Sequence, residues 1–367
     1  MLTTALCACA AILCAAEPTS EDVTINGPAD DVTLAATLLL PEGATESEPA
    51  PCVVLITGSG PQDRDESIAG KKPFRVLAEG LAAHGYATLR YDDRGTKGLG
   101  LGESTGSFED STTADFAEDA AAVVAFAAAD PRIDGARVVV CGHSTGGLVS
   151  AMLLGSDRVP AAAVLLAPPA VRGADLLAHQ SEAIALATQQ TVGTGLSDEQ
   201  LAEMNAAQRA VVLAMATDDE ERQREAAEGA IRAQMKIAGM DPAAIPPGTI
   251  ETATEQALAP LRATWMAYFL RYDPADDLRA ARVPVLAVFG GRDLQVTPKQ
   301  NVEPMRDVLL EAGDPRSAVI TLATSNHLFQ PAETGLLDEY EKLADEMQPM
   351  LIDLVAAWLD RVVGEER

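Results

Sequence analysis

The sequence predicts an α/β fold in which a mostly parallel, doubly wound sheet carries a long helical insertion. Short apolar runs alternate with helical segments, which is the pattern of parallel strands joined by crossover helices. One apolar run leads directly into the motif Gly-His-Ser-Thr-Gly at residues 142–146, and a small-residue apolar segment follows it. That order indicates a strand, a sharp turn and a helix. Between residues 170 and 282 the alternation stops, and the sequence is charged, rich in alanine and strongly helical.

The predicted strands are runs of β-branched and other apolar residues that end at or near glycine or proline. The segment 17–50 supplies an antiparallel start to the sheet, and its strand at 32–40 ends at Pro41. The remaining runs are largely apolar, which is typical of strands buried on both faces. They lie at residues 52–57, 87–91, 137–141, 162–167, 283–289 and 318–322.

The helices between these strands are predicted from apolar residues at helical spacing and from capping residues. Gly85 closes the first helix, and Thr112 or Thr113 caps the second. The predicted helices lie at residues 74–84, 113–129, 148–154, 298–312 and 347–363.

The pattern divides the chain into three parts. Residues 1–16 are apolar and alanine-rich and end in small residues, which predicts a signal peptide and hence a periplasmic or secreted protein. No lysine or arginine precedes the apolar run, so an uncleaved extension of a cytoplasmic protein is the alternative. Residues 17–169 and 283–367 form the predicted catalytic domain. Residues 170–282 form a predicted cap or lid, because they join the sheet at the carboxyl end of a strand, where ligands bind.

Composition excludes some classes of partner. The 367 residues include 27 basic and 55 acidic side chains, which gives a formal net charge of −28. A surface this acidic repels polyanions, which excludes nucleic acid and anionic lipid as partners and favours neutral or cationic small molecules. No stretch approaches the roughly 18 apolar residues that a membrane span needs. Nothing in the composition fixes an oligomeric state.

Two cysteines, Cys52 and Cys141, lie beyond the apolar leader. Cys52 opens one predicted strand and Cys141 closes another, so in neighbouring parallel strands they would lie about a strand length apart. A disulfide needs Cα atoms within about 7 Å. We therefore expect two free, buried thiols.

The motif at residues 142–146 predicts a nucleophile. A serine on a sharp strand-to-helix turn adopts a strained backbone angle, which requires small residues two positions before and two positions after it. Gly142 and Gly146 meet that requirement for Ser144. A serine hydroxyl is a weak nucleophile until a base removes its proton, so the chain must supply a histidine.

The chain has four histidines, and their positions select one of them. His84 precedes the glycine that ends a helix, at the opposite end of the sheet. His143 lies inside the motif and is expected to point away from the serine, and His179 lies in the insertion. His327 follows a strand, in a loop at the carboxyl edge of the sheet, and is the predicted base.

A catalytic histidine needs an acid that fixes its tautomer and stabilises its cation. Asp293 follows the strand at 283–289 in a glycine turn, and it precedes His327 in the chain. The order serine, acid, histidine is the one found in a large group of hydrolases. The aspartates between residues 273 and 277 are weaker candidates, because no strand leads into them.

A tetrahedral intermediate on such a serine carries an oxyanion, which needs preorganised hydrogen-bond donors. The first predicted donor is the backbone N–H of Thr145, the residue after the nucleophile. The second is the backbone N–H of Ser59, in the Gly-Ser-Gly turn that follows the strand at 52–57. No metal is predicted in the site.

Further motifs accompany the serine turn. They are Thr-Gly-Ser-Gly-Pro-Gln-Asp-Arg-Asp at 57–65, Lys-Pro-Phe at 72–74, Arg-Tyr-Asp-Asp-Arg-Gly at 90–95 and Gly-Gly-Arg-Asp at 290–293. Together they resemble the α/β-hydrolases of the bacterial serine-carboxylesterase type, which are distantly similar to prolyl oligopeptidase and acyltransferase-like hydrolases. The resemblance covers nearly everything after residue 30. It implies ester hydrolysis through an acyl-enzyme, with no cofactor, and a structural ion pair for Arg94.

The sequence thus predicts a serine esterase that acts on small, uncharged acyl esters, with a small-molecule ester as its partner. A peptidase or amidase with the same triad is the alternative, because sequence does not show how a poorer leaving group receives its proton. A non-catalytic binding protein on the same fold is the least expected function, because the predicted site is complete. The lipase-type His-Gly-Gly-Gly motif is missing, so bulky lipids are not expected substrates.

Overall fold

A single mixed sheet organises the structure, which is a computed structural model that describes residues 18–246, 248–344 and 346–364. The predicted signal peptide at 1–16 lies outside the described residues. The strands of the sheet are β1 (Thr19–Asn26), β2 (Thr33–Leu40), β3 (Ala50–Ile56), β4 (Ala87–Tyr91), β5 (Ile133–His143), β6 (Ala162–Leu166), β7 (Val285–Gly290) and β8 (Ala318–Leu322).

The order of these strands across the sheet is β1-β2-β4-β3-β5-β6-β7-β8. β1 pairs antiparallel with β2, and β2 pairs antiparallel with β4, whereas all later neighbours are parallel. The predicted antiparallel start and parallel sheet are therefore both confirmed. Because β5, β6, β7 and β8 run the same way, the loops that follow them all emerge at one edge of the sheet.

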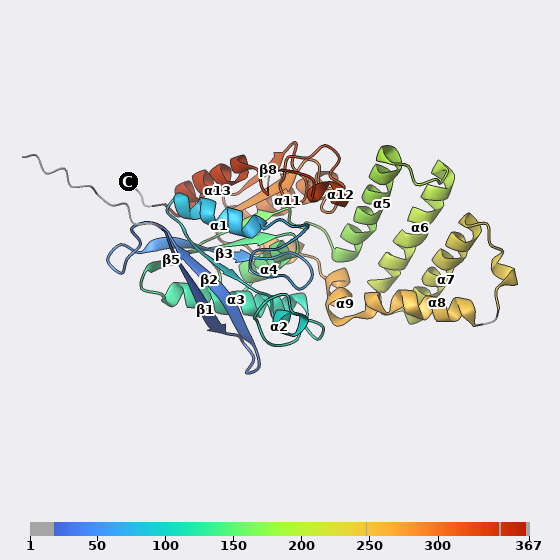
Figure 1. The fold of residues 1–367 in the computed structure, drawn as a ribbon, viewed down its shortest axis with the longest axis horizontal. Coiled ribbons are helices and arrows are strands. Elements are labelled where there is room, and N and C mark those ends of the chain that lie inside the picture. Colours follow the sequence, from blue (N-terminus) through green and yellow to red (C-terminus); the bar gives the residue numbers. More distant parts are fainter. Residues whose placement is uncertain (1–17, 247, 345, 365–367) are drawn as a thin grey trace, which may run out of the picture.

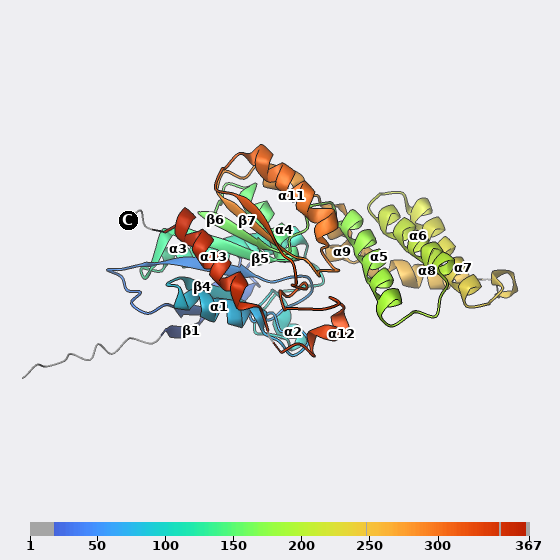
Figure 2. The ribbon, with the colours of Figure 1, turned by 90° about the horizontal axis from the view of Figure 1, so that it is seen from above.

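Helices cover both faces of the sheet (Figures 1 and 2). One face packs against α1 (Pro73–Ala83) and α13 (Pro349–Val362). The other packs against α3 (Thr113–Ala129), α4 (Thr145–Leu154) and α11 (Pro298–Ala312). Short helices α2 (Thr96–Leu99), α10 (Ala275–Arg279) and α12 (Leu337–Tyr340) lie in the connections.

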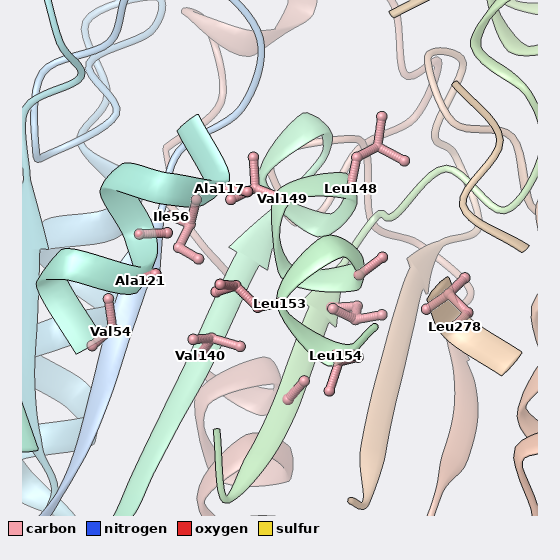
Figure 3. Close-up of a cluster of buried hydrophobic side chains, with 14 of the residues drawn as sticks. Val54, Ile56, Ala117, Ala121, Val140, Leu148, Val149, Leu153, Leu154 and Leu278 are labelled. Atoms are coloured by element: carbon pink, nitrogen blue, oxygen red, sulfur yellow. The ribbon is translucent and has the colours of Figure 1, made fainter. Parts of the chain in front are cut away.

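The apolar run of β3 shows why these strands lack polar alternation. Val53 and Leu55 belong to the cluster beneath α1 and α13, whereas Val54 and Ile56 belong to the cluster beneath α3 and α4. Successive side chains of a strand point to opposite faces, and here both faces are covered, so every position is apolar. Figure 3 shows the second cluster, in which Val149 and its neighbours on α4 fill the space between α3 and the sheet.

The insertion between β6 and β7 is helical in its described residues. Its helices are α5 (Gly173–Thr191), α6 (Asp198–Met215), α7 (Glu220–Ile237), α8 (Thr249–Leu258) and α9 (Thr264–Arg271). They pack in chain order, α5 on α6, α6 on α7 and α7 on α8. α6, α7 and α8 extend away from the sheet, while α9 returns to the catalytic domain and contacts α3 (Figures 1 and 2).

Cys52 and Cys141 are both free and buried, as predicted. Cys52 pairs with Val138 of β5, and Cys141 pairs with Leu55 of β3, so the two cysteines occupy different rows of neighbouring strands. Burial raises the pKa of each thiol well above its ordinary value, so neither is a reactive thiolate. In the described part of the chain, no helix has the length and apolar character needed to cross a membrane.

Candidate active site

Ser144 occupies a sharp turn between β5 and α4, at the carboxyl edge of the sheet. Its backbone has φ 52° and ψ −116°, a combination that a non-glycine residue rarely adopts. The backbone N–H of Ser144 donates to the carbonyl of Leu166 on β6, and the carbonyl of Ser144 accepts from Gly147 in the first turn of α4. Neighbouring backbone thus fixes a strained residue, as is typical of functional positions.

The two glycines of the motif are required by close packing of the backbone. A Cβ atom on Gly146 would lie 2.6 Å from the carbonyl oxygen of Thr57, and one on Gly142 would lie 2.5 Å from Ser150 Oγ. Both distances are far shorter than real Cβ contacts. The loop after β3 and the start of α4 therefore approach the serine turn more closely than any side chain would permit.

The structure brings His327 and Asp293 together. His327 Nδ1 lies 2.8 Å from Asp293 Oδ2, and both side chains are buried. The other carboxylate oxygen, Oδ1, accepts hydrogen bonds from the backbone N–H groups of Gln295 at 2.8 Å and Val296 at 2.9 Å. Asp293 is therefore held from both sides, and its orientation toward His327 is fixed.

The glycine pair before Asp293 lets its loop pack against the loop of His327. A Cβ atom on Gly290 would lie 2.5 Å from the carbonyl oxygen of Asn326, and one on Gly291 would lie 2.7 Å from the Ala323 backbone. Asn326 also closes its own loop, because its side chain accepts from the backbone N–H of Gln330 at 2.9 Å. The two glycines of the Gly-Gly-Arg-Asp motif thus let the loop of Asp293 pack closely against the loop of His327.

Thr145 and the turn after β3 lie on the same side of Ser144. The Thr145 N–H begins α4, and the first N–H groups of a helix have no partner within it. In the Gly-Ser-Gly turn, the backbone N–H of Gly58 donates to Glu66 Oε1 at 2.8 Å. The predicted oxyanion donor is the next backbone N–H along this turn, that of Ser59. Gly58, Gly60 and Thr145 line one small cavity.

That cavity has a volume of about 10 Å³, which is room for about one water molecule. Phe116 of α3 and Trp265 of α9 form part of its wall. Larger hollows, of about 500 and 580 Å³, lie between α5 and α6 and beside Arg64 and Arg90. None of Ser144, Asp293 and His327 lines any of these three spaces, but the wall of the small cavity includes Thr145, the residue directly after Ser144.

The carboxylates Asp93 and Asp119 line the cavity, and both have hydrogen-bond partners. Arg94 binds Asp119 through two hydrogen bonds, Nε to Oδ2 at 2.6 Å and Nη2 to Oδ1 at 2.7 Å, and both residues are buried. Arg94 thus forms a structural ion pair. Asp93 accepts from Thr57 Oγ1 at 2.8 Å and from the backbone N–H of Gln62 at 2.9 Å. Burial raises the pKa of Asp93 to about 8.

The other three histidines have distinct surroundings. His84 is exposed, with its Nε2 3.3 Å from Asp353 Oδ1 on α13, and His179 lies on α5 of the insertion. His143, in contrast, is buried between Glu66 and the loop of His327. Sequence reasoning set His143 aside and did not single out Glu66. The available signal was that a buried imidazole needs partners for both ring nitrogens.

Within the described residues, no group of three or more His, Cys, Asp or Glu side chains is arranged to hold a metal ion. The polar groups that the structure places at this edge of the sheet are the Ser144 hydroxyl, the His327–Asp293 pair and the backbone N–H groups at the start of α4. A hydroxyl, an imidazole bonded to a carboxylate and unpaired helix N–H groups are the chemical groups that serve elsewhere as nucleophile, base and oxyanion donors.

Comparison with known proteins places the chain in a family. The sequence profile of the family described as X-Pro dipeptidyl-peptidase (S15 family) matches residues 30–308. A curated relative, the esterase EstD of Thermotoga maritima, is 26% identical over 340 residues, which cover 92% of this chain and 67% of the relative.

Solved structures support the same fold. An esterase of Pyrococcus furiosus matches with a TM-score of 0.54 at 14% identity, over 95% of this chain and 92% of that one. The α/β hydrolase GrgF from a Penicillium species matches with a TM-score of 0.53 at 16% identity, over 95% and 100%. The dipeptidyl peptidase 4 of Porphyromonas gingivalis matches with a TM-score of 0.52 at 15% identity, over 95% of this chain and 36% of that one.

At these identities the likeness shows the fold alone, the α/β-hydrolase fold predicted from the motifs. Because the profile spans well over half of its residues, the chain belongs to the X-Pro dipeptidyl-peptidase (S15) family of α/β-hydrolases.

Proposed function

We propose that the protein is a serine esterase that hydrolyses carboxylic esters of small, uncharged acyl groups. Ser144 attacks the ester carbonyl while His327 takes its proton, and Asp293 orients the imidazole and stabilises its cation. The backbone N–H groups of Thr145 and Ser59 stabilise the oxyanion. His327 then protonates the leaving alcohol and activates the water that hydrolyses the acyl-enzyme.

One observation carries this proposal: His327 forms a buried hydrogen bond with Asp293, and its loop is bonded to His143, the residue before the strained Ser144. The acid is fixed by two backbone donors, so the imidazole is held with its proton on Nδ1 and its Nε2 free to accept. The loop of His327 also lies against the serine turn, because the His327 carbonyl oxygen is 2.9 Å from His143 Nε2. Resemblance to the esterase of Thermotoga maritima supports the same reaction.

The preference for small acyl groups is supported by the cavity beside Thr145. Its volume of about 10 Å³ leaves little room beyond a methyl group in this conformation. Trp265 supplies one wall, and it stacks on Phe269 with ring centroids 5.3 Å apart. We infer that the insertion at residues 170–282 acts as a cap on the acyl pocket through α9.

The experiment is a panel of p-nitrophenyl esters of increasing chain length, with wild-type protein and a Ser144→Ala variant. We expect turnover to be fastest for the acetate, and the variant to lose at least about 10³-fold in kcat, because alanine lacks the hydroxyl that attacks the ester. A Ser144→Ala variant that kept most of the activity would contradict the proposal. Failure of a fluorophosphonate to label wild-type Ser144 would favour a non-catalytic binding protein instead.

Peptide or amide hydrolysis is the second candidate, and the description of the S15 family favours it. The same triad serves both reactions, and an amide differs in requiring protonation of a poorer leaving group. Matched substrates separate the two, with an X-Pro p-nitroanilide set against an ester of the same acyl group. A kcat/KM for the anilide that equals or exceeds that for the ester would identify a peptidase.

We also propose that the protein is exported, on the basis of the apolar leader at residues 1–16. Expression of the full chain followed by N-terminal sequencing tests this. Cleavage after residue 16 supports export, and an intact N-terminus on protein recovered from the cytoplasm contradicts it.

A further inference from the structure

A second histidine–carboxylate pair lies directly behind the triad. Glu66 Oε1 is 2.8 Å from His143 Nδ1, and the same oxygen accepts the backbone N–H of Gly58 at 2.8 Å. His143 Nε2 is 2.9 Å from the carbonyl oxygen of His327. Glu66 and His143 therefore connect three parts of the site: the turn that carries Ser59, the serine turn and the loop of the catalytic base.

The partners of His143 determine its protonation. A carbonyl oxygen only accepts hydrogen bonds, so Nε2 must carry a proton to bond to His327. Glu66 Oε1 faces Nδ1, and a proton shared between a carboxylate and an imidazole resides on the imidazole, which is the stronger base, so Nδ1 also carries a proton. The two contacts together assign an imidazolium to His143. Burial opposes this charge, but the Glu66 carboxylate outweighs it and raises the pKa of His143 above its ordinary value.

The surroundings of the pair are apolar and tight. Glu66 is 1% exposed and His143 is 3% exposed. The side chains that enclose them are Pro73, Phe74, Leu166, Leu328, Phe329 and Met347, and they leave no room for a water molecule. A buried ion pair costs desolvation energy and is seldom a net source of stability. The pair does satisfy two backbone groups, the Gly58 N–H and the His327 carbonyl, and both belong to loops of the site.

The loop that carries Glu66 is strained and firmly anchored. Glu66 has φ 53°, in the left-handed region, which costs about 1–3 kcal/mol for a residue other than glycine. Asp63 Oδ1 accepts hydrogen bonds from the backbone N–H groups of Asp65 at 3.1 Å and Ser67 at 2.9 Å. Arg64 Nε donates to Asp92 Oδ1 at 2.9 Å. The conformation that delivers the carboxylate to His143 and Gly58 is thus imposed by its neighbours.

We propose that Glu66 and His143 form a positioning pair for the triad and for the oxyanion donor. This inference rests on the proposed function. Neither residue need touch the substrate. Glu66 holds the Gly58 amide so that the next amide, that of Ser59, points into the site, and His143 holds the backbone of His327 at a fixed distance from Ser144. The two hydrogen bonds of His143 require its second proton, and Glu66 supplies the compensating charge.

The test compares Glu66→Ala and Glu66→Gln with wild type, using p-nitrophenyl acetate hydrolysis and the rate at which a fluorophosphonate labels Ser144. We expect Glu66→Ala to lower kcat about 100-fold with KM changed less than about threefold, because misplacing a donor or a base affects the transition state most. Glu66→Gln should recover at least about tenfold of that loss, since its amide oxygen still accepts from Gly58. Labelling rates should follow the same order.

A matched control separates positioning from stability. Tyr86 is buried, and its hydroxyl donates to Asp360 at 2.7 Å next to α13, far from the serine turn. Tyr86→Phe removes one hydrogen bond of a buried side chain, so it should lower the melting temperature and leave kcat and the labelling rate unchanged. A folded Glu66→Ala variant whose kcat stays within about threefold of wild type would overturn the proposal.

Nitrogen NMR of the histidine rings tests the pair without relying on activity. The chain has four histidines, so a His143→Gln variant assigns the His143 signals by their loss. We expect both ring nitrogens of His143 to be protonated in the wild type at neutral pH and one of them to lose its proton in Glu66→Gln. A single unprotonated nitrogen in the wild type would overturn the pair even if Glu66→Ala does not fold. Absence of labelling in the wild type would instead overturn the proposed function, and the spectra would still decide the protonation of His143.

Discussion

Replacing Asp293 with asparagine should impose the wrong tautomer on His327. In the wild type, Asp293 Oδ1 accepts two backbone N–H groups, from Gln295 and Val296, while Oδ2 faces His327 Nδ1 at 2.8 Å. An asparagine in this position will place its carbonyl oxygen toward the two backbone donors. Its NH₂ group then faces Nδ1, which must become an acceptor. The ring proton moves to Nε2, which can no longer take a proton from Ser144.

The size of the effect follows from the cost of the opposite amide orientation. If the NH₂ group faced the backbone donors, the part-buried N–H of Gln295 and the buried N–H of Val296 would both lose their acceptor, at about 1–3 kcal/mol each. The productive tautomer is therefore disfavoured by about 2–6 kcal/mol. Each 1.4 kcal/mol is about tenfold in population, so kcat should fall by about 30-fold to about 10⁴-fold. The same exchange in serine proteases lowers kcat about 10⁴-fold.

The assay is hydrolysis of p-nitrophenyl acetate at neutral pH, with thermal unfolding measured on the same samples. Asp276→Asn is the matched control, because that carboxylate is almost fully exposed on α10 and pairs with Arg279 at the surface. We expect the control to keep wild-type kcat, and KM to change little in Asp293→Asn. A folded Asp293→Asn enzyme with kcat within about tenfold of wild type would refute the tautomer argument and the role of Asp293.

Three further predictions concern the surroundings of the site. The pKa of Asp93 is about 8, above its ordinary value of 3.8, so the native state binds this proton more tightly than the unfolded state does. The free energy of unfolding should therefore fall as the pH rises from about 4 to 8, by up to about 1.4 kcal/mol per pH unit. Urea unfolding at a series of pH values should show a weaker dependence of that free energy on pH in Asp93→Asn than in the wild type. Trp265→Ala should move the preferred p-nitrophenyl ester to longer acyl chains, since Trp265 walls the cavity beside Thr145; an unchanged chain-length profile would exclude that role. Gly146→Ala should lower stability by about 1–3 kcal/mol and slow the labelling of Ser144, because its Cβ would collide with the Thr57 carbonyl.

The sheet and the positions of its site residues could be predicted because each depends on a local pattern. Ser144, Asp293 and His327 all follow apolar strands that run in the same direction, so their loops meet at one edge of the sheet. The helix expected at 113–129 is α3, and the strand expected at 318–322 is β8, with the same bounds. Capping residues and glycine turns fix such boundaries within the segment itself.

Glu66 and His143 could not be paired from the sequence, because their contact depends on a loop conformation. They are 77 residues apart, and Glu66 follows no strand. Its carboxylate reaches the site only because the backbone at Glu66 adopts a positive φ, an angle that sequence pattern does not predict for glutamate. The sequence predicts that Arg94 forms an ion pair, but not with which carboxylate. Its partner is Asp119 on α3, and that choice depends on how the helix packs.

The structure also changes how the insertion is understood. A cap predicted from composition alone would be assumed to cover the site with all of its helices. Here α6, α7 and α8 pack on one another away from the sheet (Figure 1). α9 is the helix whose Trp265 lines the cavity beside Thr145. The ring centroids of Trp265 and Phe108 are 6.5 Å apart, and Phe108 lies in the loop before α3. An aromatic contact therefore joins the insertion to the catalytic domain at this point. Acyl-chain selection should therefore respond to substitutions on α9 and at Phe108, and should be insensitive to substitutions on the exposed faces of α7 and α8.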